Sequence, residues 1–190
     1  MPDTVIKEKV AFLVAEVGIE RMELVEPWIA VAESGYEPIL VATVAGRVQA
    51  FDDLDPSVEF GVDHVVDDVE ASDFRALVIP GGVVNSDRLR TERRAIEFVR
   101  GFFALGAPVA AICHAPWNLI EAGVLGGRSV TSWPSLRTDI VNAGARWKDQ
   151  PSVICREGAS VLITGRGPED LLPFCSALAA ELCESNMRVR

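Results

Sequence analysis

The residues with the clearest chemical potential in this 190-residue chain are an adjacent cysteine and histidine, Cys113 and His114. The apolar run 109–112 ends abruptly at Cys113, and a new apolar segment begins at Pro116. This pattern predicts a buried strand, a sharp turn, and a helix with proline in its first turn. Unpaired N–H groups at a helix start favour a thiolate, so the pattern predicts a nucleophilic Cys113 with a lowered pKa.

The alternative for Cys113 is the usual place of a free cysteine, a small buried side chain in the core. The strand, turn and helix start around it favour the reactive interpretation. Cys155, Cys175 and Cys183 lie in ordinary strand and helix patterns, and we expect them only to pack. With no closely spaced cysteine pair and only two histidines, we expect reduced thiols and no histidine-rich metal site.

Three further groups stand at the ends of predicted strands or beside Cys113. Spacing leaves two interpretations of Glu20: a solvated acid in a first helical turn, or a carboxyl that faces the thiol and moves protons. The pair Gly81-Gly82 fits a plain turn, but the nearby cysteine turn favours a backbone that approaches an oxyanion. For His114, neighbours in sequence do not ordinarily face each other, so a bond from its ring to Cys113 stays open.

Strands alternate with helices along most of the chain. The pattern predicts strands at 9–15, 39–43, 77–80, 109–112, 129–133, 153–155 and 161–164, with small antiparallel strands within 46–67. It predicts helices at 22–35, 91–105, 116–123, 135–143 and 169–183. The expected fold is an α/β three-layer sandwich, flavodoxin-like, with a mainly parallel central sheet between helices. We expect one domain over residues 1–190, with 1–8 flexible, and a ligand crevice at the carboxyl ends of the strands.

Several segments, in this order, resemble the ThiJ/PfpI family, the superfamily of the parkinsonism-associated deglycase. The resemblance spans about residues 9–182 and is most similar to the PfpI-like branch of bacterial and archaeal stress proteins. The segments that carry it are Gly18–Glu20 with Glu23–Pro27, Leu77–Gly82, Ala111–Trp117, Glu121–Arg128, Thr131–Pro134, Asn142–Ala145 and Thr164–Leu171. It implies a class I glutamine amidotransferase-like fold.

The resemblance also implies roles for individual residues. Cys113 would be the nucleophile at the turn, and Glu20 would be its carboxyl partner. Backbone N–H groups of Gly82 and His114 would form an oxyanion hole, beside Gly81. Asp87 would reach the histidine of a neighbouring subunit. No metal or nucleotide cofactor is implied, and self-association as a homodimer or hexamer is.

One residue departs from the family pattern. Ala115 stands where the family usually has glycine directly after the Cys-His pair. Alanine disfavours positive φ, so the turn is expected to differ slightly.

Three functions compete at this stage. The first is cofactor-independent, glyoxalase- or deglycase-type action of Cys113 on small aldehydes or glycated groups. The second is a PfpI-like intracellular cysteine peptidase or amidase that uses Cys113, His114 and Asp87. The third is a redox-sensing or chaperone-like protein with little turnover, because an exposed, low-pKa thiolate oxidises readily.

Charge and hydropathy limit the partners and the location. The formal net charge of −10 argues against a nucleic-acid backbone or an anionic membrane as the main partner. Residues 1–8 contain no apolar signal core, and no later apolar run reaches membrane-spanning length. We therefore expect a cytoplasmic location, and the family resemblance implies a stress-response protein.

Overall fold

The computed structural model describes residues 7–188, and it describes side-chain exposure for residues 7–184. The expected flexibility of residues 1–8 falls mainly outside this range. The strands are β1 (Lys9–Val14), β2 (Val17–Glu20), β3 (Glu37–Ala42), β4 (Arg47–Asp52), β5 (Asp55–Gly61), β6 (His64–Val65), β7 (Ala76–Ile79), β8 (Val109–Ile112), β9 (Ser129–Val130), β10 (Arg146–Trp147), β11 (Ser152–Cys155) and β12 (Leu162–Gly165). The helices are α1 (Arg21–Glu33), α2 (Val83–Thr91), α3 (Arg93–Leu105), α4 (Pro116–Glu121), α5 (Arg137–Asn142) and α6 (Leu171–Arg188).

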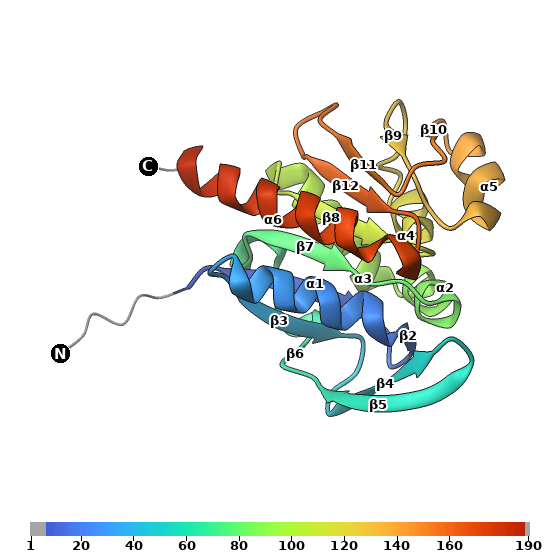
Figure 1. Ribbon diagram of the computed structural model, residues 1–190. Helices are drawn as coiled ribbons and strands as arrows, with labels where there is room; N and C mark the ends of the chain where they lie inside the picture. Colours follow the sequence, from blue (N-terminus) through green and yellow to red (C-terminus); the bar gives the residue numbers. More distant parts are fainter. Residues whose placement is uncertain (1–6, 189–190) are drawn as a thin grey trace.

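The main sheet has seven strands in the order β11-β12-β8-β7-β1-β3-β6 (Figure 1). Every pairing in it is parallel except that of β11 with β12. The continuous apolar runs predicted this arrangement, because a parallel strand covered on both faces has no solvent side. The mainly parallel α/β sandwich is therefore confirmed.

Helices cover both faces of this sheet and divide the core in two. Alternate residues of β1 show the division: Phe12 belongs to the core beneath α1 and α6, whereas Leu13 belongs to the core beneath α3 and α4. Both side chains are fully buried. Figure 1 shows α1 and α6 side by side on one face of the sheet. Because helices cover both faces of the sheet, the carboxyl ends of β1, β7 and β8 are held together at one edge of the sheet.

Four elements differ from the sequence-based expectations. The helix expected at 91–105 with Thr91 as its cap begins at Arg93, and Glu92 is the N-cap residue. Thr91 instead ends a separate helix, α2, whose mixed polar sequence gives no clear helical pattern. β2 forms a second, three-stranded sheet with β4 and β5, and β9 ends at Val130 rather than at residue 133.

Helix length and hydropathy also bear on membrane insertion. Within the described part of the chain, no helix is both long and apolar enough to cross a bilayer.

Candidate active site

Cys113 occupies the turn between β8 and α4 in a left-handed backbone conformation, with φ of 61°. Such a conformation costs a non-glycine residue about 1 kcal/mol or more and persists only where neighbours enforce it. Here the Cys113 N–H donates to the Gly165 carbonyl at 3.0 Å, and its carbonyl accepts from the Trp133 N–H at 2.9 Å. Ala115 has φ of −54°, so the alanine at this position introduces no strain. The strained residue of the turn is the cysteine itself.

The carboxyl group beside the Cys113 thiol belongs to Glu23 and not to Glu20, which corrects the assignment that the family resemblance implied. Glu23 lies on α1, and its side chain is fully buried. The Cys113 thiol and the Gly81 N–H interact with its carboxyl. Neither completes a well-formed hydrogen bond, because both carboxyl oxygens lack such a partner. Glu20 precedes α1 as its N-cap residue, and its carboxyl accepts a hydrogen bond from the Asp53 N–H.

Burial governs the protonation of this pair. It raises the pKa of Glu23 to about 8, and the charge of Glu20 also raises it. Burial likewise raises the pKa of the Cys113 thiol, and an ionised Glu23 raises it further. The backbone N–H groups of Gly82 and His114 act in the opposite direction, because they donate to the sulfur. The lowered thiol pKa expected from the helix start is therefore not what this environment produces.

The two N–H groups that contact the sulfur come from the residues expected to form an oxyanion hole, Gly82 and His114. Gly82 has φ of 95°, and a Cβ there would collide with the Gly18 carbonyl. Glycine at this position thus lets two backbone segments pass close to the cysteine. Gly81 lies directly against the Cβ of Cys113. An oxygen that becomes charged near the sulfur would find these donors already oriented.

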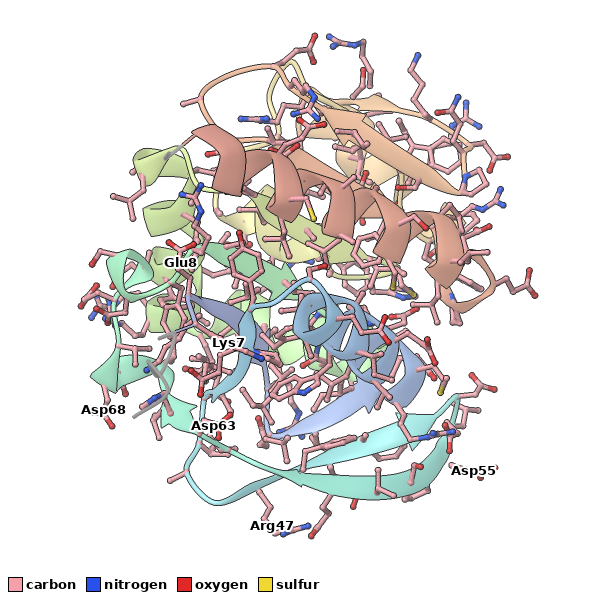
Figure 2. The ribbon with its side chains drawn as sticks, turned by 60° about the vertical axis from the view of Figure 1, so that its left-hand side comes forward. Lys7, Glu8, Arg47, Asp55, Asp63 and Asp68 are labelled. Atoms are coloured by element: carbon pink, nitrogen blue, oxygen red, sulfur yellow. The ribbon has the colours of Figure 1, made fainter. Side chains whose placement is uncertain are left out.

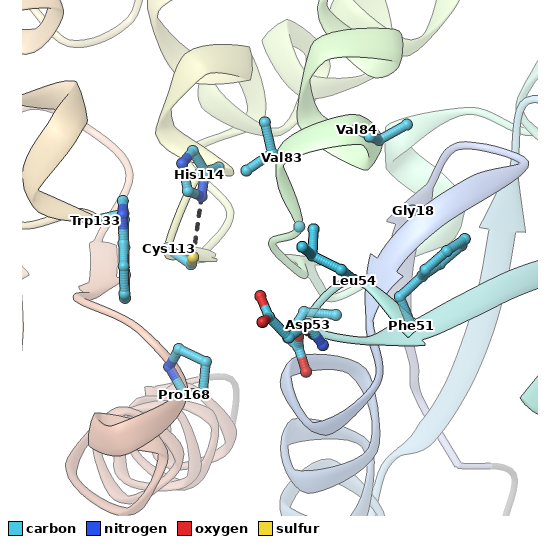
Figure 3. Close-up of a pocket in the computed structure, with 12 residues that line it drawn as sticks. Gly18, Phe51, Asp53, Leu54, Val83, Val84, Cys113, His114, Trp133 and Pro168 are labelled. Carbon is cyan, nitrogen blue, oxygen red and sulfur yellow. Dashed lines mark hydrogen bonds between the residues drawn. The ribbon is translucent and has the colours of Figure 1, made fainter. Parts of the chain in front are cut away.

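His114 contacts Cys113 directly, with Nδ1 3.2 Å from Sγ (Figure 3). His114 is 7% exposed, and burial lowers its pKa to about 4. Trp133 stacks on it at 6.0 Å between ring centroids, and Trp117 lies 5.3 Å away at a steeper angle. The imidazole is therefore neutral at pH 7, and one nitrogen can exchange a proton with the sulfur.

A pocket of about 410 Å³ opens above Cys113 (Figure 3). Its lining comes from chain segments that are far apart in sequence: Gly18, Glu20, Phe51, Asp53, Leu54, Gly82, Val83, Val84, Cys113, His114, Trp133 and Pro168. Glu20 stands in its wall, where Oε2 accepts a hydrogen bond of 3.2 Å from the Asp53 N–H. The structure thus brings Glu20, Gly82, Cys113 and His114 to one cavity.

Asp87 lies outside this cavity, on the exposed side of α2. Its expected contact with the histidine of another subunit stays a prediction. The sequence interpretation also missed Glu23 and Asp53. A single acid within the apolar stretch 22–25 was the available signal for Glu23. Among residues 7–188, no group of three or more His, Cys, Asp or Glu side chains could hold a metal ion.

The fold and the site together have known counterparts. The sequence model of the DJ-1/PfpI family matches residues 8–181. General stress protein 18 of Bacillus subtilis is 39% identical over 155 residues, which cover 82% of this chain and 87% of that protein. A protein of Pyrococcus horikoshii named as a deglycase is 38% identical over 146 residues, covering 77% and 84% of the two chains.

A solved structure shares the fold closely. A two-domain protein of Anabaena variabilis with DJ-1/ThiJ/PfpI-like and ferritin-like domains superimposes with a TM-score of 0.84 and 32% identity. The match covers 93% of this chain but only 48% of that protein, so this chain spans about half of its length. On these findings, the chain belongs to the DJ-1/PfpI family.

Proposed function

We propose that this protein acts on small reactive aldehydes, such as glyoxal or methylglyoxal, or on glycated groups, through covalent attack by Cys113. The observation that carries the proposal is the position of Cys113 at the floor of a pocket, between the Glu23 carboxyl and two backbone N–H donors. The relative named as a deglycase supports the same chemistry. The residues involved require no cofactor for it.

The first step joins the sulfur to the aldehyde carbon. Glu23, or His114 through Nδ1, accepts the thiol proton as the carbon–sulfur bond forms. With a pKa of about 8, Glu23 is mainly protonated at neutral pH, and its ionised fraction is a much stronger base than an ordinary carboxylate. The carbonyl oxygen becomes an alkoxide, and the N–H groups of Gly82 and His114 stabilise it. Protonation of that oxygen gives a hemithioacetal.

The second stage converts the hemithioacetal of a dicarbonyl to a hydroxy acid. A proton leaves the carbon bonded to sulfur and returns to the neighbouring carbon through an enediol, which gives a thioester. Water then adds to the thioester, releases glycolate or lactate, and restores the thiol. Glu23 is placed to carry these protons because it touches the sulfur. The net reaction consumes one water and no oxidant or reductant.

The direct test is glyoxal consumption with detection of glycolate. We expect Cys113→Ala and Cys113→Ser to lose the activity of the native protein. Cys183→Ala is the matched control, because Cys183 is an exposed thiol on α6, and it should keep full activity. Undiminished glyoxal consumption by Cys113→Ala would overturn the proposal.

A cysteine peptidase or amidase is the second candidate, and the 3.2 Å contact between Cys113 and His114 favours it. In this reaction His114 accepts the thiol proton and later returns it to the leaving amine. The imidazole would need an orienting acid, which Asp87 of a neighbouring subunit would supply. Cleavage of fluorogenic peptides that disappears in both Cys113→Ser and Asp87→Asn would decide for this function.

A redox-sensing or chaperone-like role is the third candidate. The N–H donors that surround the Cys113 sulfur would also stabilise a sulfinate. Intact-mass measurement after mild peroxide treatment should show oxygen added at Cys113. Oxidation at another cysteine, with Cys113 unchanged, would count against this role.

We also infer self-association, as a homodimer or hexamer, in the cytoplasm. Leu54, Val83 and Val84 are 83%, 51% and 47% exposed beside the pocket, and a second copy would cover them. The four free cysteines suit a reducing compartment. Light scattering after size exclusion measures the association, and a strictly monomeric protein at micromolar concentration would contradict it.

A further inference from the structure

The pocket above Cys113 is lined by charge of one sign. Glu20 and Asp53 are the ionisable acids in its lining, which contains no lysine and no arginine. The adjacent cation Arg21 is already paired with Asp52 at 2.7 Å. His114 is neutral at pH 7, since burial lowers its pKa to about 4. The two carboxylates therefore face the cavity without a compensating charge from its walls.

The local backbone holds these two acids together. Asp53 adopts a left-handed conformation, with φ of 59°, in the turn between β4 and β5. In this conformation its N–H donates to Glu20 Oε2 at 3.2 Å. Burial raises the pKa of Glu20, and the charges of Asp52 and Asp53 raise it further. A cation between the acids would relieve this repulsion.

The opposite wall is aromatic. Trp133 is 41% exposed although it is a large apolar side chain. Figure 3 shows its ring edge-on, with a face turned toward the side of the pocket where Asp53 lies. An indole face attracts ammonium and guanidinium groups through its quadrupole. Carboxylates on one side and an indole on the other make a pair of walls that favours a cationic group between them.

We propose that this pocket selects carbonyl substrates that carry an ammonium or guanidinium group and rejects those that carry a carboxylate. Glu20 and Asp53 are the specificity-determining residues, and Trp133 supplies the apolar face. The carbonyl chemistry rests on the proposed function, but the charge preference does not, because it follows from the lining of the cavity. It can therefore be measured without turnover.

The primary test compares two thiol reagents of similar size and opposite charge. These are the trimethylammonium-ethyl and sulfonatoethyl methanethiosulfonates, with modification of Cys113 followed by mass spectrometry. A cavity lined by charges of one sign raises the local concentration of oppositely charged solutes about tenfold or more. We expect the cation-to-anion rate ratio at Cys113 to exceed that of free cysteine by about tenfold at low salt. The excess should shrink in 0.5 M salt because ions screen exposed charges.

Variants assign the effect to the two acids. Glu20→Gln combined with Asp53→Asn should bring the ratio close to that of free cysteine. Asp68→Asn is the matched control, because it also removes one negative charge. Asp68 lies on the opposite side of the molecule from Asp55, which is at the tip of the β4–β5 hairpin (Figure 2). It should leave the ratio unchanged. A native ratio equal to that of free cysteine, or an equal loss in Asp68→Asn, would overturn the proposal.

A second measurement covers the case in which Cys113 reacts with neither reagent. The fluorescence of Trp133 is obtained by subtracting the emission of Trp133→Phe from that of the native protein. We expect the ratio of quenching by caesium to quenching by iodide to be larger for Trp133 than for free tryptophan. The reverse order would show that the cavity is not negative and would overturn the proposal.

Turnover then links the charge preference to substrates. For an active enzyme, we expect betaine aldehyde, which carries a trimethylammonium group, and glyoxylate to inhibit glyoxal consumption by forming reversible hemithioacetals with Cys113, because neither can isomerise to a hydroxy acid. After correction for their affinities for free cysteine, betaine aldehyde should inhibit at a concentration at least about tenfold lower than glyoxylate. Stronger inhibition by glyoxylate would contradict the proposal. If the thiol reagents showed the charge preference but the protein consumed no aldehyde, the proposed charge selectivity would stand. The proposed function would then be overturned instead.

Discussion

The Glu23 carboxyl and the Gly81 backbone approach each other so closely that a Cβ atom at position 81 would collide with Glu23 Oε2. The same atom would lie 2.7 Å from the Cβ of Cys113 and 2.9 Å from the Ile112 carbonyl oxygen. Glycine at the end of β7 is thus a condition for placing a buried acid beneath the cysteine. The acid, the glycine and the thiol form one packed unit.

Gly81→Ala should therefore disrupt the site and destabilise the protein. The added methyl group has no free space, so we expect a loss of about 2–4 kcal/mol in the free energy of unfolding. For a chain of this size that corresponds to a fall in Tm of roughly 4–16 °C. Thermal denaturation measures the stability, and glyoxal consumption should fall at least about tenfold.

Gly126→Ala is the control for this substitution. A Cβ at Gly126 meets no atom within 4 Å, and its φ is not in the left-handed range. Its Tm should stay within about 2 °C of the native value. Equal stability of the two variants would mean that β7 and α1 separate easily, contrary to the packing described.

Protonation of Glu23 should make stability depend on pH. Folding raises its pKa from 4.5 to about 8, so the folded state binds the proton more tightly than the unfolded state. The stabilising contribution is complete below pH 4.5 and disappears as pH rises through 8. Relative to Glu23→Gln, the native protein should lose about 4 kcal/mol between pH 5 and pH 8. Urea denaturation at several pH values measures this difference.

Glu33→Gln provides the comparison, because Glu33 is an exposed acid at the end of the same helix. Its stability curve should run parallel to the native curve across this pH range. If Glu23→Gln also ran parallel, the buried carboxyl would not carry the shifted pKa.

The neutral state of His114 should be visible by NMR. Burial lowers its pKa to about 4, so its ring signals should stay constant between pH 8 and pH 5.5. Because the folded pKa is depressed, this histidine favours folding above pH 6.5, and that contribution is lost as pH falls toward 4. His64→Gln leaves one histidine and assigns the signals.

Removal of the stacked indole tests the cause of that shift. Trp133→Ala exposes the imidazole to water, and the pKa of His114 should rise toward 6.5. Trp28→Phe, which changes a tryptophan whose ring packs on Phe12, should leave it unchanged. A pKa near 6.5 in the native protein would mean that the ring is already hydrated.

The sequence predicted the sheet well because burial of both faces leaves a plain signal. The apolar runs of β1, β7 and β8 had no other plausible interpretation, and their carboxyl ends located the pocket. α2 escaped prediction because contacts with α3, α4 and β2, rather than its own hydrophobic pattern, stabilise it.

The site was predicted in part, for a similar reason. Cys113 and His114 follow from a local turn, whereas the partner acid depends on how α1 is rotated against Gly81. Residues three apart on a helix share a side, so spacing could not separate Glu20 from Glu23. Only tertiary packing decides which of the two acids is buried under the sulfur. The protonation state of the thiol follows from that burial, so it could not be predicted from the sequence either.

The two acids should differ sharply in their effect on Cys113. Glu23 raises the pKa of the thiol when it is ionised, and Glu20 is not among the groups that shift it. Above pH 8, where Glu23 is ionised, Glu23→Gln should alkylate faster at Cys113 than the native protein, about tenfold for each pKa unit removed. Glu20→Gln should change the profile much less, because Glu20 acts on the thiol only through the pKa of Glu23. Iodoacetamide is the suitable reagent, because it is uncharged and insensitive to the acidic pocket wall. If Glu20→Gln gave the larger acceleration, Glu20 rather than Glu23 would be the acid coupled to the thiol.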